Sequence, residues 1–296
     1  MNVLAYTLKR LWNTPPRQVF GALRRRLSRH NTRVIYDLEE IFSAPKHTRS
    51  QRPYDFLHRY QAIIHRHHPE WIEIDFAGKR VLESGCGPML GWGPLAVYLG
   101  CDHFTGVEPM FNSAVFDHPQ WSGRYLLNFY RDAAALFGYR MDFDRFLQQV
   151  RERVTVLPTT HLSASWSEPF DIWLSNSVLE HVEPLAETLL QLGTLAAPGC
   201  RFLHAVDFGN HRATKHPFDD LYTMPPATYR QRFGTQINLY RCNDVQRFLQ
   251  DAGFQTQLTP YYDAREFFTA SISPWWRQRY DEAALFLKVG LFHGVR

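Results

Sequence analysis

The chain has 296 residues, of which 45% are hydrophobic and 21% are charged. This length and composition exclude an intrinsically disordered protein and are typical of one large globular domain with an appendage. The formal charge of +4 is unevenly spread, because residues 1–34 carry eight Lys or Arg and no acid. The four cysteines form no Cys-x-x-Cys pair, so we expect a cytoplasmic protein without a zinc site or a disulfide framework.

The first 34 residues have the apolar spacing of two short amphipathic helices, which Pro15 and Pro16 separate. Arginines decorate the second helix and leave two interpretations open. Either the helix packs onto the main domain with a solvated basic face, or it makes a peripheral contact with an anionic membrane surface. No stretch of the chain has the roughly 18 consecutive apolar residues of a transmembrane helix.

Residues 54–68 also show helical spacing, and we assign residues 1–75 to an N-terminal helical cap. The helix ends on His65-Arg66-His67-His68. Neighbouring residues of a helix point in different directions, so we expect a solvated helix end here rather than a metal site.

Strand and helix patterns alternate from residue 76 to residue 296. We expect strands at 80–83, 103–108, 154–157, 170–175, 201–206, 254–258 and 284–292. Helices are expected at 90–99, 184–195 and 244–251, the last of them capped by Asn243. This alternation predicts an α/β fold with a doubly wound, mostly parallel seven-stranded sheet. Two long intervals, at about 110–150 and 207–242, leave the carboxyl ends of strands, where we expect them to form lids over a ligand.

A glycine turn follows the first expected strand, and an acid ends the second. The turn reads Glu83-Ser84-Gly85-Cys86-Gly87, and Glu108 follows about twenty residues later. Glycine lets the backbone approach a ligand closely, and a carboxylate at that distance can accept hydrogen bonds from both hydroxyls of a ribose. The two motifs together predict a site for a nucleotide-sized ligand.

With residues 170–182, FDIWLSNSVLEHV, these motifs closely resemble those of class I methyltransferases that depend on S-adenosylmethionine. The resemblance covers the chain from about residue 79 to its end and implies a Rossmann-like fold with S-adenosyl-L-methionine as methyl donor. It implies that the glycine turn approaches the amino-acid part of the donor and that Glu108 binds the ribose. The donor-binding residues it implies are Glu83, Gly85, Cys86, Gly87, Glu108, Asn176, Glu180 and His181.

Two features depart from the pattern of this family. Met89 stands where the third glycine is usual, so we expect a longer turn that makes its close contact through Gly91. Thr160 and His161 stand where many members of the family carry an acid for the adenine ring.

The chemistry of the methyl acceptor is expected where the fifth strand ends, because His204, Asp207 and His211 stand there. An aliphatic hydroxyl loses its proton as it is methylated, and histidine is the commonest base. We interpret the three residues as a base with an orienting carboxylate, and a hydrogen-bonded structural cluster is a close alternative. A metal site is the third interpretation, since His and Asp suit zinc, iron or manganese, although methyl transfer requires no metal.

Residues 204–211 and 238–244 are more loosely similar to segments of bacterial methyltransferases that act on surface glycans and secondary metabolites. This similarity implies O-methylation of a sugar, a glycan or another small hydroxylated metabolite. Arg241 in the second segment is interpreted as a ligand for a substrate phosphate or as a surface residue. Nucleic acid is disfavoured as a substrate, because outside residues 1–34 the chain has 25 basic and 29 acidic side chains.

Two other functions remain open. Gly85, Gly87 and Gly91 loosely imitate the fingerprint of an NAD-dependent Rossmann oxidoreductase, but the acid before the first glycine and residues 170–182 argue against it. A non-catalytic scaffold that retains the cofactor fold is the other alternative, and it would bind the donor without turnover.

Overall fold

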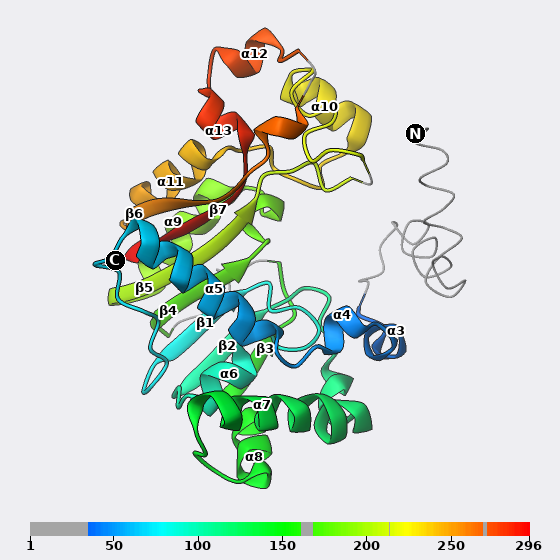
Figure 1. Cartoon of the computed structure of the whole chain (residues 1–296), viewed down its shortest axis with the longest axis vertical. Coiled ribbons are helices and arrows are strands. Elements are labelled where there is room, and N and C mark those ends of the chain that lie inside the picture. Colours follow the sequence, from blue (N-terminus) through cyan, green and yellow to red (C-terminus); the bar gives the residue numbers. More distant parts are fainter. Residues whose placement is uncertain (1–34, 161–167, 213, 269–270) are drawn as a thin grey trace.

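The computed structural model describes residues 35–160, 168–212, 214–268 and 271–296 (Figure 1). The helices expected in residues 1–34, and His161, lie outside the described residues. The centre of the molecule is a seven-stranded sheet with the order β3-β2-β1-β4-β5-β7-β6. Its strands are β1 (Arg80–Ser84), β2 (His103–Val107), β3 (Val154–Leu157), β4 (Phe170–Asn176), β5 (Ala196–Asp207), β6 (Gln255–Asp263) and β7 (Leu287–Val295). β7 is antiparallel to β5 and β6 and the other neighbouring pairs are parallel, which confirms the expected doubly wound sheet.

Helices cover both faces of the sheet, because successive side chains of a strand point to opposite faces. Val81 and Ile172 pack in one core with residues of α5 (Arg52–His67), α6 (Gly93–Tyr98), α7 (Leu127–Phe137) and α8 (Phe143–Arg153). Leu82 and Trp173 pack on the other face with residues of α9 (Leu185–Leu195) and α11 (Cys242–Asp251). In Figure 1, α5 crosses the near face of the sheet, and it belongs to the same core as β1.

A third, smaller core lies at the end of the molecule away from α7 and α8 (Figure 1). It joins the insertion after β5 to the segment before β7 and is built on rings such as Tyr222, Tyr229 and Trp276. Its helices are α10 (Pro226–Phe233), α12 (Pro274–Arg277) and α13 (Glu282–Phe286). The remaining short elements are α3 (Leu38–Ser43) and α4 (Pro45–Thr48), 3₁₀ turns at Ser113–Asp117, Leu179–His181 and Arg265–Phe267, and a π-helix at Trp121–Leu126.

Most expected elements are present, but several of their ends differ. α6 begins at Gly93 rather than residue 90, because a longer turn occupies the residues before it. The N-cap of α11 is Arg241 rather than Asn243, and the Asp244 carboxylate accepts a hydrogen bond from the Arg241 N–H at 3.0 Å. The strand expected at 284–292 begins as helix α13, because the Asp281 carboxylate caps that helix.

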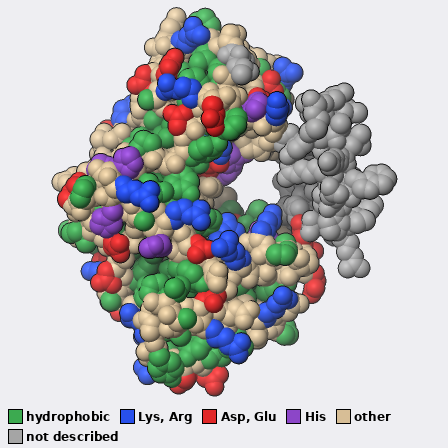
Figure 2. All heavy atoms as spheres, in the orientation of Figure 1, with side chains coloured by type: hydrophobic (Ala, Val, Ile, Leu, Met, Phe, Trp, Pro, Cys, Tyr) green, Lys and Arg blue, Asp and Glu red, His purple; other side chains and the backbone are tan. Residues whose placement is uncertain are grey.

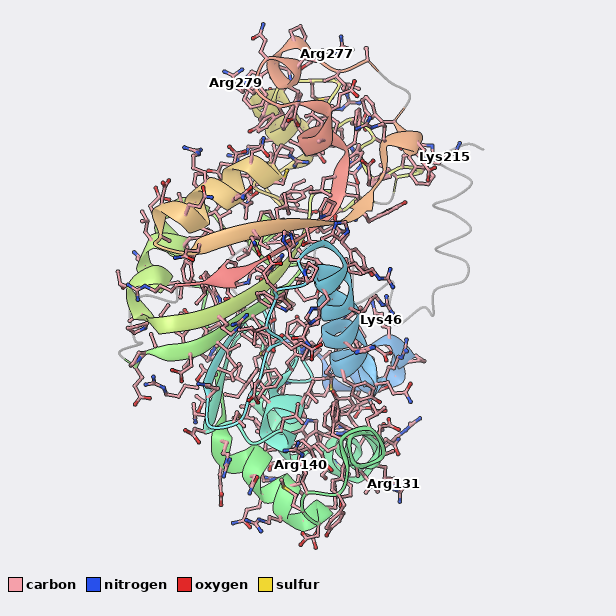
Figure 3. The ribbon with its side chains drawn as sticks, turned by 60° about the vertical axis from the view of Figure 1, so that its left-hand side comes forward. Lys46, Arg131, Arg140, Lys215, Arg277 and Arg279 are labelled. Carbon is pink, nitrogen blue, oxygen red and sulfur yellow. The ribbon has the colours of Figure 1, made fainter. Side chains whose placement is uncertain are left out.

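In Figure 3, Arg277 and Arg279 lie at one end of the molecule, Arg131 and Arg140 lie toward the other, and Lys46 lies between them, so the labelled basic side chains do not gather in one patch. They are Lys46, Arg131, Arg140, Lys215, Arg277 and Arg279. Among the helices in the described ranges, none combines the length and the apolar character that crossing a bilayer requires.

Candidate functional site

The glycine turn passes close to the segment that follows β4. Gly85 has a φ of 73°, and a Cβ on it would lie 2.2 Å from a methyl carbon of Val178, so only glycine fits. Gly87 has a φ of 65°, but a Cβ there would meet nothing within 4 Å. The turn therefore has open space beside its backbone, where a ligand can approach.

Glu83 holds the second half of this turn. Its side chain is only 3% exposed, and its carboxylate accepts a hydrogen bond from the Trp92 N–H at 2.8 Å. Burial raises the pKa of Glu83 well above its usual value. A Cβ on Gly91 would lie 2.2 Å from both oxygens of this carboxylate, so the close contact of Gly91 is made with Glu83.

Glu108 follows β2 and faces the same turn. Its carboxylate accepts hydrogen bonds from the Gly87 N–H at 3.0 Å and from the Met110 N–H at 3.1 Å. Burial raises the pKa of Glu108. A carboxylate has about four lone-pair sites, and the Tyr36 side chain also hydrogen-bonds to Glu108, so the carboxylate keeps acceptor capacity for about one further hydroxyl group.

A cavity of about 600 Å³ opens beside the turn, a size typical of ligand sites. Among its lining residues are seven of the expected donor-binding residues: Glu83, Gly85, Cys86, Gly87, Glu108, Asn176 and His181. Sequence patterns had not indicated the other part of the wall, which includes Tyr36, His47, Arg49, Arg52 and Phe56 before the sheet and Tyr125 in the first insertion. Figure 2 shows the molecule hollowed on this side, with Lys and Arg side chains near the beginning of α5 at the rim.

A long-range hydrogen bond ties the helix before the sheet to the end of β4 at this wall. The Tyr60 hydroxyl of α5 donates to Asn176 Oδ1, at the end of β4, with a distance of 3.0 Å. Helical spacing had predicted α5, but a contact between residues 116 apart in the chain has no local signal.

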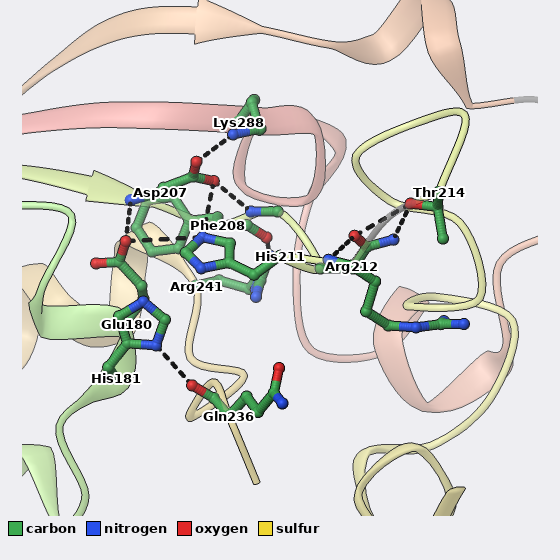
Figure 4. Close-up of polar contacts among 12 residues, drawn as sticks. Glu180, His181, Asp207, Phe208, His211, Arg212, Thr214, Gln236, Arg241 and Lys288 are labelled. Carbon is green, nitrogen blue, oxygen red and sulfur yellow. Dashed lines mark hydrogen bonds and ion pairs between the residues drawn. The ribbon is translucent and has the colours of Figure 1, made fainter. Parts of the chain in front are cut away.

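Beyond the ends of β4 and β5, four side chains form a polar cluster of Glu180, His181, Asp207 and His211 (Figure 4). His211 Nε2 lies 3.4 Å from Asp207 Oδ1 and 3.7 Å from Glu180 Oε1. The ring centroids of His181 and His211 are 4.8 Å apart. Because His181 also lines the cavity, the cluster adjoins the space beside the glycine turn.

The orientation of His181 follows from its backbone partner. Its Nδ1 lies 2.6 Å from the carbonyl oxygen of Gln236, which can only accept, so Nδ1 carries the hydrogen and Nε2 keeps a lone pair. Burial lowers the pKa of His181, which favours this neutral form. The 3₁₀ turn Leu179–His181 therefore presents a neutral imidazole at the cavity wall.

The two carboxylates of the cluster differ in their surroundings. Burial disfavours the charge on Asp207, but hydrogen bonding to His211 and the Lys288 ammonium outweigh burial and lower its pKa to about 2. Asp207 Oδ1 also accepts a hydrogen bond from the Gly209 N–H at 2.8 Å. Glu180 is 4% exposed, and burial raises its pKa to about 8.

His204 does not join this cluster, contrary to the expectation from the sequence. It is fully buried between Trp173 and Phe202, and its Nδ1 bonds the Ser175 hydroxyl at 2.9 Å. Residues three apart on a strand point to opposite faces, so His204 and Asp207 of β5 separate. That alternation was available in the sequence and would have excluded the grouping of His204 with Asp207.

Arg241 matches neither interpretation made from the sequence. It is 1% exposed, and its Nη1 donates to the Phe208 carbonyl oxygen at 2.9 Å and to the Tyr222 hydroxyl at 2.8 Å. The guanidinium therefore ties α11 to the insertion after β5 rather than lying free for a substrate phosphate.

Comparison with known proteins agrees with this geometry. A family profile described as a methyltransferase domain matches residues 47–258, well over half of the chain. The chain belongs to this methyltransferase family. A comparison with curated protein sequences found no match to the methyltransferase.

Solved structures similar to the methyltransferase include a crystal structure of an S-adenosylmethionine-dependent methyltransferase from Mesorhizobium loti. The identity is 14% and the TM-score 0.46, over 83% of this chain and 98% of that chain. Another is the N-methyltransferase NodS from Bradyrhizobium japonicum in complex with S-adenosyl-L-homocysteine, with 15% identity and a TM-score of 0.39, over 81% of this chain and 86% of that chain.

The methyltransferase uses S-adenosylmethionine, and the residues of the cavity fit this donor. The open space at Gly87 suits a close backbone approach, and the remaining acceptor capacity of Glu108 suits a ribose hydroxyl. The family match also favours methyl transfer over the hydride transfer of an NAD-dependent oxidoreductase.

Proposed function

We propose that the methyltransferase methylates a hydroxyl oxygen of a sugar, a glycan or another small hydroxylated metabolite. The observation that carries the proposal is the polar cluster, which adjoins the cavity through His181. An aliphatic hydroxyl is a weak nucleophile and loses its proton during transfer, so its site needs positioned lone pairs. The His181 Nε2 and the carboxylates of Glu180 and Asp207 are groups of this kind.

The donor side of the proposal rests on the glycine turn. The bound donor supplies a methyl group already activated on a sulfonium. We assign Gly85, Cys86 and Gly87 to its amino-acid part, with Glu83 holding the turn, and Glu108 to its ribose hydroxyls. The remaining work of the chain is to align the acceptor with the methyl group and to exclude water.

The acceptor side differs from the expectation in one respect. Asp207 and His211 stay in the proposed acceptor site, and Glu180 and His181 take the place of the buried His204.

A labelling experiment tests the acceptor class. The purified protein is incubated with a bacterial extract and a donor whose methyl group is deuterated, and mass spectrometry with fragmentation locates the label. We expect a methyl ether on a sugar or a related hydroxylated compound. A label on nitrogen or carbon would refute the proposal.

Variants test the role of the cluster. We expect His181→Ala to lower kcat by roughly 10²- to 10⁴-fold, the range for loss of a positioned proton acceptor, with S-adenosylhomocysteine affinity unchanged within about twofold. His67→Ala, at the exposed end of α5, is the matched control and should keep full activity. Equal rates for the two variants would argue against the cluster.

We also propose a cytoplasmic protein that touches the inner membrane surface through the arginines of residues 1–34. Basic side chains near an anionic bilayer contribute roughly 1 kcal/mol each. Replacement of Arg24, Arg25 and Arg26 by Glu should then abolish pelleting with phosphatidylglycerol vesicles. Equal pelleting of both proteins would leave only the packing interpretation.

A further inference from the structure

Glu180, His181 and His211 place their ligand atoms within 4.8 Å of one another, and His181 also lines the cavity. We propose that these three residues bind one divalent transition-metal ion, of the zinc, iron or manganese class. Two imidazoles and one carboxylate are a ligand set that such ions take, with further positions left for substrate. The inference deepens the proposed function. The role of the ion in methyl transfer rests on that function, whereas the binding of the ion to these three residues does not.

The spacing of the three groups is near that of a coordination shell. Bonds of about 2.0–2.2 Å to the metal place neighbouring ligand atoms roughly 3.0–3.5 Å apart. His211 Nε2 and Glu180 Oε1 are already 3.7 Å apart, and all three ligand atoms lie within 4.8 Å. Both histidines are exposed at least in part, so movements of their side chains would bring the three ligand atoms closer to these distances.

Glu180 is a buried carboxylate that lacks full compensation. Its Oε1 accepts a hydrogen bond from the Asp207 N–H at 3.3 Å, whereas Oε2 is buried without a hydrogen-bond partner among the described residues. A buried polar oxygen without a partner is costly, and a cation bound to it would satisfy its lone pairs. The Lys288 ammonium beside the cluster is paired with Asp207.

The histidines are held as metal-binding histidines usually are. A ligating imidazole commonly donates its second N–H to a carbonyl or a carboxylate, which fixes the ring. His181 makes this contact through Nδ1 with the Gln236 carbonyl, and the contact leaves Nε2 for the metal. His211 Nε2 lies 3.4 Å from Asp207 Oδ1, so this nitrogen is directed toward the carboxylates, where the ion would bind.

The position of the ion gives it a task in methyl transfer. A divalent cation that binds the acceptor hydroxyl lowers the pKa of that hydroxyl. Because the ion would take the Nε2 lone pair of His181, the O–H proton would leave to water instead of to the imidazole. The oxygen lone pair would form the O–C bond, and the donor sulfur would keep the electron pair of the broken S–C bond. The ion would make the acceptor hydroxyl more acidic, which a neutral histidine alone would not do.

Metal binding is measured on the full-length protein. The protein is stripped with EDTA and titrated with Co²⁺, and visible absorption reports coordination by nitrogen and oxygen ligands. Mn²⁺ and Zn²⁺ are quantified by elemental analysis after gel filtration. We expect one equivalent per chain for the unaltered protein and for the control His67→Ala, and less than about a tenth for His181→Ala and His211→Ala.

The outcomes separate this inference from the proposed function. An unaltered protein that binds no metal, or metal that stays bound in both histidine variants, would overturn the site. If the variants fail to fold, the unaltered protein alone decides the question. A Co²⁺ spectrum that stays the same as that of the hydrated ion in water would reject the metal site. Full O-methylation by metal-free protein would reject the role of the ion and keep the proposed function. Bound metal with an N-methylated product would keep the metal site and reject the proposed function.

Discussion

Replacement of Gly91 by alanine tests how the donor turn is held. Gly91 has a φ of 50°, a conformation that costs an L-residue roughly 1–2 kcal/mol. The new Cβ would lie 2.2 Å from both carboxylate oxygens of Glu83, so that buried side chain must move. Its hydrogen bond from the Trp92 N–H is then lost, at a further cost of about 1–3 kcal/mol for an unsatisfied buried group. The expected loss of stability is therefore about 2–5 kcal/mol.

Gly78→Ala is the matched control, because Gly78 has a φ of 65° and a Cβ there would meet nothing within 4 Å. We expect it to lose only the backbone term of roughly 1–2 kcal/mol. Urea unfolding followed by tryptophan fluorescence measures both losses, and calorimetry measures S-adenosylhomocysteine affinity. Gly91→Ala should weaken that affinity at least about tenfold, or 1.4 kcal/mol, and Gly78→Ala should leave it unchanged. Equal stability losses, or unchanged affinity in Gly91→Ala, would refute the reasoning.

Two further predictions concern ionisable groups. Glu108→Gln should weaken S-adenosylhomocysteine binding by about tenfold or more in calorimetry, since hydrogen bonds to a charged group contribute roughly 1.5–3 kcal/mol. Glu152→Gln, at an exposed position, is the control. Equal affinities of the two variants would contradict the assignment of Glu108 to the ribose. Burial lowers the pKa of His204 to about 3 from its usual 6.5. Between these pH values His204 is protonated in the unfolded chain and neutral in the folded protein. His204 therefore lowers the free energy of unfolding as the pH decreases, by up to about 1.4 kcal/mol per pH unit. His204→Gln should remove that contribution in urea unfolding at pH 5 and pH 7, and an unaltered pH dependence would count against a neutral buried histidine.

The sheet and its donor turn were accessible from the sequence because their signals are local. Apolar runs bounded by glycine and proline predicted the strands, and glycines before a helix predicted the turn at Gly85 and Gly87. The shift of the last strand shows the limit of this approach. An apolar run does not tell whether its first residues are helical, and the Asp281 cap decided that α13 precedes β7.

By itself, then, the sequence determined the strand pattern, the glycine turn and the acid at Glu108, since each depends on neighbours in the chain. Only the tertiary structure decided which groups share the acceptor site. The alternation of β5 sends His204 into the core and Asp207 to the cavity side, where a turn after β4 brings His181 beside His211. The tertiary structure also places α5 across the sheet, where the Tyr60 hydroxyl bonds Asn176. Such contacts join residues that are far apart in the chain, and they form only when the sheet is packed.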